Sequence, residues 1–403
     1  MITENPMTAL ERRTVSSLAL LYSFRMLGLF MVLPLLALYA IDLPGASPSL
    51  IGLALGIYGL SQALLQIPFG WLSDRIGRKP VIVGGLVLFA MGSLVAATAD
   101  SITGVVLGRA LQGAGAIAAT IMAMLADLTR EEQRTKAMAV VGISIGFSFA
   151  LALVLGPLVA ARGGLAGVFY LTAILAIAGI VLVIWRVPTP PVVDGSHEDT
   201  GALPALLGRS VRDMRLMRLN FGVFVLHFVL MACFLVVPQL LESAAGIAKE
   251  QHWQVYLIVL ALSVIAMAPM MRSAERGGKP QSIFALGIAL LLVALALLGF
   301  ASQTALIYLG MWMFFTGFNY LEATLPSLVS KTVFAGGKGT ALGVYSTCQF
   351  LGAFAGGALG GWVIQHGSAS ALFYMCLFLL GVWLWVAFPS NQVIRDEVNP
   401  AHS

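Results

Sequence analysis

The sequence predicts an all-α membrane protein whose twelve transmembrane helices form two pseudo-symmetric six-helix bundles. Of its 403 residues, 59% are hydrophobic and 10% are charged, and the mean hydropathy of +0.93 is far above that of a soluble domain. The apolar residues form continuous runs, each close to the roughly 20 residues that a helix needs to cross a bilayer. A closed β-barrel would instead show alternating segments of about ten residues. One long polar segment divides the runs into two sets of six.

Turn residues and charges set the expected bounds of each span. In the first bundle, residues 15–186, we expect spans at 15–41, 49–71, 80–98, 102–126, 136–161 and 166–186. In the second bundle, residues 217–388, we expect them at 217–241, 252–272, 280–300, 304–329, 339–364 and 368–388.

Three polar segments remain outside the bundles. We expect a cytoplasmic N-terminal tail at 1–14, a cytoplasmic linker at 187–216 and a second cytoplasmic tail at 389–403. The linker begins with prolines and mixed charges, which predicts a flexible segment that becomes a short amphipathic helix on the inner surface, around Leu203–Leu219. The N-terminal tail lacks the short apolar core and cleavage site of a signal peptide.

The distribution of basic residues predicts the orientation in the membrane. Of the 23 Lys and Arg, all but four fall in the tails, in the connections that follow even-numbered spans, or at the span ends next to those connections. The exceptions are Arg162 and Lys249 in odd connections and Arg25 and Arg109 inside spans. By the positive-inside rule, both termini are expected in the cytoplasm. The net charge of +5 follows from this topology and gives no reason to expect nucleic-acid binding.

The two halves repeat each other at an offset of 204 residues, with matches from 34 to 238, from 113 to 317 and from 156 to 360. The loop "DRIGRKP" at 74–80 has a shortened counterpart, "ERGGKP", at 275–280. Duplicated bundles of this kind generally meet around a central site near the bilayer midplane. Rocking of one bundle against the other then exposes that site to alternate sides. The matched residues are Pro34 and Pro238, Gly113 and Gly317, and Gly156 and Gly360.

The loop between the second and third spans carries a recognisable motif. Its sequence "GWLSDRIGRKP" resembles the loop signature of the major facilitator superfamily, Gly-x-Leu-x-Asp-Arg-x-Gly-Arg-Lys, from Gly70 to Lys79. In the fourth span, "RALQGAG" at 109–115 resembles a second signature, Arg-x-x-Gln-Gly-x-Gly. The resemblance covers the whole chain and implies the fold of the superfamily, with transport by alternating access.

A third element resembles the proton-coupled drug antiporters within that superfamily. It is the glycine-proline element of the fifth span, with Gly146, Gly156 and Pro157, and the resemblance implies that it lies where the two halves hinge. Ala160 and Ala161 stand where a glycine pair is usual. The segment "FRMLGLFMVLP" of the first span is similar to the YajR-type exporters of the same group.

The charged loop contains an acid that topology does not explain. Retention of bases on the cytoplasmic side, with binding of lipid phosphates, accounts for the basic residues but not for Asp74 or Gly77. Asp74 would face the start of the eleventh span, "AGGKGTALG", whose free amide groups carry a partial positive charge. We therefore expect a conformational latch of about 0.5 to 2 kcal/mol, braced by an Arg78–Asp127 pair. Its residues are Gly70, Asp74, Arg75, Gly77, Arg78, Lys79, Asp127 and Arg134.

Four ionisable side chains lie well inside the spans, namely Arg25, Arg109, His227 and Glu322. A charge there costs about 2.5 to 3.5 kcal/mol on insertion scales, so such residues usually face an interior cavity. Burial disfavours an ionised carboxyl and a nearby cation favours it, so we expect Glu322 to bind the coupling proton, shared with His227. Alternatively, Glu322 pairs with Lys331 or reaches water, and His227 only packs. Arg25 would bond backbone carbonyls or Glu322, and the resemblance gives Arg109 a role in coupling.

Polar and aromatic side chains on otherwise apolar spans are candidate substrate contacts. Each one alone is equally explained by helix–helix packing. A cavity with few fixed charges suits a neutral or amphipathic substrate, and no array of arginines predicts binding of a phosphate ester. The candidates are Met31, Tyr58, Gln62, Gln66, Gln112, Asn319, Tyr320, Tyr345 and Gln349.

These features predict a secondary active transporter, with proton-coupled multidrug efflux of small apolar or amphipathic compounds as the main interpretation. The alternatives are a sugar or metabolite exporter or an uncoupled facilitator of the same superfamily, and, more remotely, a non-transporting membrane sensor. No catalytic motif predicts an enzyme, and Cys233, Cys348 and Cys376 are expected to be packed thiols. We expect no metal and no cofactor, a proton gradient as the energy source, and a monomer in a bacterial inner membrane. The expected partners are a small molecule, protons and membrane lipids, without nucleic acid.

Overall fold

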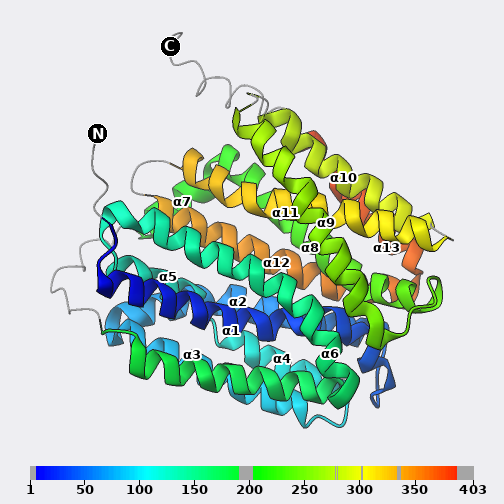
Figure 1. The fold of residues 1–403 in the computed structure, drawn as a ribbon, viewed down its shortest axis with the longest axis horizontal. Coiled ribbons are helices and arrows are strands. Elements are labelled where there is room, and N and C mark those ends of the chain that lie inside the picture. Colours follow the sequence, from blue (N-terminus) through cyan, green and yellow to red (C-terminus); the bar gives the residue numbers. More distant parts are fainter. Residues whose placement is uncertain are drawn as a thin grey trace. The chain divides into compact units, whose positions relative to one another are not determined.

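The computed structural model describes residues 6–189, 203–276, 278, 280–300, 303–333 and 337–387. The chain divides into two compact units, Met1–Ser196 and His197–Ser403, and each is built from long helices (Figure 1). The predicted all-α class is confirmed. The C-terminal tail lies outside the described residues, as do residues 190–202 of the linker and residues 334–336 before the eleventh span.

In the first unit, α1 packs along α6, α2 packs against α4, and α3 packs against both α4 and α6 (Figure 1). The helices are α1 (Ala9–Tyr39), η1 (Ala40–Asp42), α2 (Pro48–Ile76), α3 (Arg78–Ala97), α4 (Ile102–Ala114), α5 (Ala118–Asp127) and α6 (Glu131–Arg186). The fifth and sixth predicted spans both lie in α6, which turns at Gly164, where a φ of +59° is a conformation that glycine adopts readily. The two spans are thus joined by a turn of minimal length.

Two helix boundaries in this unit differ from the expected spans. The first helix begins at Ala9, inside the predicted tail 1–14, because Thr8 and Glu11 form a capping box that satisfies its free amides. The fourth predicted span, 102–126, is broken into α4 and α5, which leaves Gly115 and two neighbours outside helical geometry. The break exposes backbone carbonyls in the middle of a membrane-spanning segment, where they need partners from other helices.

In the second unit, α8 packs along α12, and α11 packs against α9 and α10. The helices are α7 (Leu203–Arg212), α8 (Met214–Ser243), η3 (Lys249–Gln251), α9 (His252–Arg276), α10 (Pro280–Phe300), α11 (Thr304–Thr332), α12 (Lys338–His366) and α13 (Ala369–Ala387). The amphipathic helix predicted to reach Leu219 ends at Arg212 instead, because Asp213 caps the start of α8 by accepting from the Arg215 amide at 2.8 Å. Cys233, Cys348 and Cys376 are free thiols.

Ten helical stretches among the described residues are long and apolar enough to cross a membrane. One of them, α6, contains two predicted spans. The ten do not include α11, which carries Asn319 and Glu322 within its apolar run. This helix also carries the candidate proton-binding residue, Glu322.

The internal repeat has a structural counterpart at the closest helix contacts. A Cβ atom added to Gly156 of α6 would lie 2.9 Å from the carbonyl oxygen of Met31 in α1. A Cβ atom added to Gly360 of α12 would lie 3.0 Å from Leu235 in α8. Because Met31 and Leu235 are separated by the same 204 residues as Gly156 and Gly360, the fifth helix of each bundle approaches the first at an equivalent point.

Candidate functional site

Three polar side chains meet inside the second unit, one each from α8, α11 and α12. The side-chain nitrogen of Gln349 lies 2.8 Å from His227 Nε2 and 3.2 Å from Glu322 Oε1. His227 Nε2 lies 3.7 Å from Glu322 Oε2. We call His227, Glu322 and Gln349 the polar cluster. It brings together the two predicted proton-coupling residues of this half and one predicted substrate contact.

The hydrogen bonds define the protonation pattern of the polar cluster. His227 Nδ1 lies 3.1 Å from the carbonyl oxygen of Val223, which can only accept, so the proton of a neutral ring is on Nδ1. Nε2 then accepts one amide hydrogen of Gln349, and Glu322 Oε1 accepts the other. Gln349 thus fixes the imidazole and the carboxylate relative to each other without carrying a charge itself.

The second oxygen of Glu322 is the atom left free in this arrangement. Oε2 is buried and has no hydrogen-bond partner among the described residues, although the side chain as a whole is 37% exposed. Glu322 lies next to His227, and no ion pair between Glu322 and Lys331 is present among the described residues. A buried carboxylate oxygen without a donor is unfavourable, and binding a proton there removes the charge. Glu322 thus keeps one unpartnered carboxylate oxygen beside His227.

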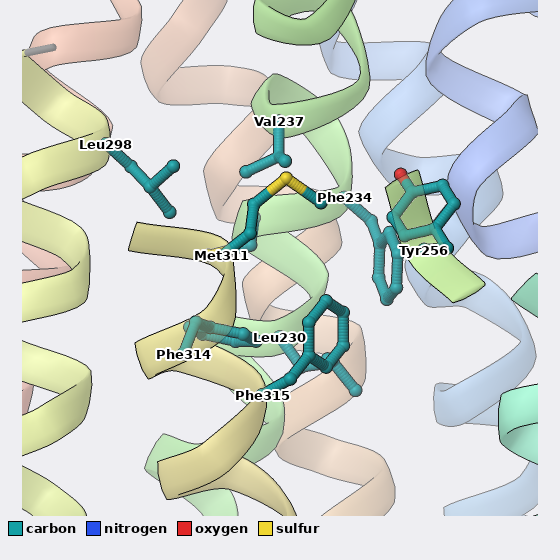
Figure 2. A pocket seen from close by; sticks show the side chains of 9 residues that line it. Leu230, Phe234, Val237, Tyr256, Leu298, Met311, Phe314 and Phe315 are labelled. Carbon is teal, nitrogen blue, oxygen red and sulfur yellow. The ribbon is translucent and has the colours of Figure 1, made fainter. Parts of the chain in front are cut away.

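A small apolar cavity lies between α8, α9, α10 and α11 of the same unit (Figure 2). Phe318 connects its wall to the polar cluster, because its ring stacks on Phe314 with centroids 6.0 Å apart and lies 5.9 Å from the His227 ring. None of the residues that line this cavity was among the predicted substrate contacts. It consists of Leu230, Cys233, Phe234, Val237, Tyr256, Leu298, Met311, Phe314 and Phe315.

The other predicted substrate contacts of this unit differ in their surroundings. Asn319 donates to Ser263 Oγ at 3.0 Å and so joins α11 to α9. Tyr320 is buried, with its ring beside Gly287 of α10. Tyr345 is also buried, has a hydroxyl without a described partner, and lies within electrostatic reach of Glu322.

In the first unit, the predicted membrane-embedded Arg25 is 1% exposed and contacts the break in the fourth span. Its Nη2 donates to Tyr58 Oη at 2.8 Å and Gln62 Oε1 at 2.6 Å, both in α2. The same nitrogen donates to the carbonyl oxygen of Gly115 at 3.2 Å. Gln62 contacts Gln66 one turn further on. Three predicted substrate contacts thus form one buried network with Arg25, which we call the Arg25 network.

The second embedded arginine, Arg109, is equally buried and is bonded through all three nitrogens. It donates to the carbonyl oxygens of Ala54 at 3.1 Å and Leu55 at 3.4 Å and to Gln112 Oε1 at 2.9 Å. Gln112 in turn donates to Ser93 Oγ at 2.8 Å. Arg109 and Gln112 therefore brace α4 against α2 and α3, and their hydrogen-bonding capacity is largely used within the unit.

The loop between α2 and α3 is organised around Arg78. Its Nε lies 3.0 Å from Asp127 Oδ2, its Nη1 donates to Ser73 Oγ at 2.7 Å, and it also pairs with Asp74. Gly77 between the two helices has a φ of +94°, in the region that favours glycine. The predicted Arg78–Asp127 pair is present and joins three helix ends. Contact of Asp74 with the other half stays a prediction.

The other basic residues of the loop also have partners within the first unit. Arg75 stacks on Trp71, with its guanidinium carbon 3.7 Å from the ring centroid. Lys79 donates to the carbonyl oxygen of Ile184 at 3.4 Å, near the end of α6. Arg134 donates to two carbonyl oxygens at the end of α5, at 3.1 and 3.4 Å. Cations at helix C-termini are favourable because these ends carry a partial negative charge.

The predicted glycines of the loop and hinge elements have contrasting environments. Gly156 and the buried Pro157 lie in α6, where Gly156 packs on the Met31 backbone. A Cβ atom added to Gly146 or Gly70 would have no atom within 4 Å. Close helix approach thus requires glycine at position 156, whereas the described packing does not require it at 146 or 70. The hinge role expected for Gly146, Gly156 and Pro157 stays a prediction.

One ion pair of the first unit, between Glu11 and Arg130, was not predicted from the sequence. Arg130 contacts both carboxylate oxygens of Glu11 at 2.9 Å, with a third bond of 2.9 Å from its backbone amide. Glu11 is 4% exposed and also accepts from the Thr8 amide at 2.7 Å. The Glu11 carboxylate raises the pKa of Arg130, so the arginine stays charged throughout the neutral range. The Thr8-x-x-Glu11 spacing is a signal for the helix start, but not for the distant partner.

Comparison with known proteins identifies the family. Residues 18–357 match the Major Facilitator Superfamily. The chain belongs to this superfamily. It is 48% identical over 382 residues to the inner membrane transport protein YajR of Escherichia coli (strain K12), which covers 94% of this chain and 84% of YajR. It is 27% identical over 355 residues to the multidrug resistance protein MdtH of Aeromonas hydrophila, which covers 83% of each.

Solved structures show the same superfamily fold. A bacterial homologue of the human lysosomal transporter Spinster, in an inward-facing and occupied conformation, matches with a TM-score of 0.74 at 12% identity, over 96% of this chain and 98% of that one. A D-xylose–proton symporter matches with a TM-score of 0.71 at 18% identity, over 93% and 97%. The predicted twelve-helix architecture and the resemblance to the YajR-like group are confirmed. The protein is a multi-pass membrane transporter.

Proposed function

We propose that this transporter exports small apolar or amphipathic molecules by alternating access, in exchange for protons. The observation that carries the proposal is Glu322 Oε2, a buried carboxylate oxygen without a hydrogen-bond partner among the described residues, next to His227. A coupling proton needs a group that binds and releases it inside the membrane, and Glu322 and His227 have the right chemistry. The energy source would be the proton gradient.

The hydrogen bonds of Gln349 give the proton site two alternative arrangements. With neutral His227, the Gln349 amide donates to both His227 Nε2 and Glu322 Oε1. If His227 takes the proton on Nε2, two donors face each other, so the amide must turn to present its oxygen. The protonated Nε2 can then pair with Glu322 Oε2, which lies 3.7 Å away. Protonation would thereby change the contacts between α8, α11 and α12.

The aromatic cavity wall supports a link from this site to an apolar molecule. Phe318 contacts both His227 and Phe314, so a reorientation at the polar cluster would be felt at the cavity. Close packing transmits such shifts because protein interiors contain few voids. Similarity to a protein named for multidrug resistance and to an inner membrane transporter agrees with export of drug-like compounds across a bacterial inner membrane.

Transport into proteoliposomes tests this proposal. We expect the amphipathic dye Hoechst 33342 to move against its gradient when a pH gradient is imposed, and Glu322→Gln to abolish that movement while leaving downhill dye exchange intact. Glu250→Gln is the matched control, because it neutralises an exposed acid outside the polar cluster. Uphill movement that persists in Glu322→Gln and still collapses with a protonophore would refute the assignment of the proton site.

A further inference from the structure

We propose that Arg25 binds an anionic group of the transported molecule, a carboxylate or a sulfonate, which makes amphipathic monoanions a substrate class of this protein. The inference rests on the proposed transport function and adds the chemistry of recognition. It starts from Arg25 Nε and Nη1, which are buried and have no hydrogen-bond partner among the described residues. The side chain is 1% exposed, so bulk water does not satisfy them.

A count of the N–H donors of Arg25 shows how many of them lack an acceptor. A guanidinium group has five N–H donors, two of them on Nη2. The three acceptors in the Arg25 network, Tyr58 Oη, Gln62 Oε1 and the Gly115 carbonyl, all face Nη2. Three N–H groups on Nε and Nη1 are therefore unused. An oxyanion that reaches Nε or Nη1 would accept from donors that no existing bond uses.

The charge of Arg25 is also uncompensated. The groups around it are the phenols of Tyr22 and Tyr58, the Gln62 amide, the Gly115 carbonyl and the ring of Phe89, whose centroid lies 5.9 Å from the guanidinium carbon. They come from α1, α2, α3 and the break after α4, and none is acidic. A buried guanidinium without an anion is strongly unfavourable. A ligand that carries one negative charge would remove this penalty.

Comparison with Arg109 separates a structural arginine from a binding one. Arg109 is just as buried, but each of its nitrogens bonds an oxygen of α2 or α4. Bracing the broken fourth span accounts for the single Arg25 nitrogen that contacts Gly115. It leaves the other two nitrogens of Arg25 unexplained, whereas Arg109 has no nitrogen without a partner. The nearby rings of Tyr22, Tyr58 and Phe89 would suit an aromatic or apolar body attached to the anion.

Matched pairs of probes test the inference on the purified full chain in detergent, without a proton gradient. The pairs are benzoate and benzamide, 2-naphthoate and 2-naphthamide, and decanoate and decanamide, each measured by isothermal binding and by thermal stabilisation. Charged hydrogen bonds are stronger than neutral ones. We therefore expect the wild-type protein to bind the carboxylate more tightly than the amide in at least one pair, by about tenfold or more in Kd. Arg25→Gln should remove the preference. Arg25→Lys, which keeps a point charge, should retain part of it.

The outcomes separate this inference from the proposed proton coupling. Glu322→Gln should keep the preference for the carboxylate, because binding is measured at one pH and Arg25 belongs to the other unit. Wild type that prefers no carboxylate over its amide in any pair overturns the inference, even if Arg25→Gln fails to fold. So does an undiminished preference in Arg25→Gln. Loss of pH-driven transport in Glu322→Gln would not affect the measured preference for carboxylate over amide.

Discussion

Substitution of Gly156 by alanine tests the packing of α6 on α1. The added Cβ atom would lie 2.9 Å from the Met31 carbonyl oxygen and 3.4 Å from both Met31 Cα and Leu35 Cδ1. Backbone atoms cannot move aside as a flexible side chain can, so the two helices must separate. Overpacking of this kind costs about 1 to 3 kcal/mol. The higher helix propensity of alanine offsets about 1 kcal/mol of this.

Gly146→Ala on the same helix is the matched control, because its added Cβ atom meets nothing within 4 Å. It gains the same helix propensity without the clash. We therefore expect the thermal unfolding midpoint in detergent to fall for Gly156→Ala relative to Gly146→Ala, at about 2 to 4 °C per kcal/mol for a unit of this size. Equal midpoints for the two variants, or a higher one for Gly156→Ala, would refute the close approach of α6 and α1.

Three further changes test individual contacts. Glu11→Gln should lower the unfolding midpoint because it breaks the pair with Arg130, and a second change, Arg130→Gln, should then add little; full additivity would argue against the pair. Gln349→Leu removes a donor to the Glu322 carboxylate, so the transport–pH curve should move to higher pH; an unmoved curve would exclude Gln349 from the proton site. The predicted latch holds the cytoplasmic face closed, so Asp74→Asn should increase labelling of cysteines introduced on the cytoplasmic side of the central site predicted between the bundles, and unchanged labelling would rule out the latch.

The helices were predictable because membrane spans leave strong signals. Continuous apolar runs of the right length indicated α1, α2 and α3 without further information, and the capping box at Thr8 could have corrected the start of α1. The break between α4 and α5 carries no such signal, since glycine is also common in unbroken membrane helices. It depends on Arg25, 90 residues earlier in the chain, which bonds the Gly115 carbonyl.

The candidate site was predictable as a set of residues but not as an arrangement. Glu322 and His227 are conspicuous because ionisable groups are rare inside apolar spans. Their bridge through Gln349 is set by the packing of three helices, and any polar residue on α12 could have filled that position. In the same way, Arg25 and Arg109 look alike in sequence. The number of backbone carbonyls that reach each guanidinium distinguishes them, and that depends on tertiary contacts.

The protonation state of Glu322 is the most direct test of the proposed proton coupling. Infrared difference spectra of the purified protein, titrated from alkaline to acidic pH, report the C=O stretch of each carboxyl group that gains a proton. We expect wild type and Glu250→Gln to share a buried carboxylic-acid component that Glu322→Gln lacks. Spectra of wild type and Glu322→Gln that superimpose in the carboxylic-acid region would show that Glu322 takes up no proton, and would contradict the account.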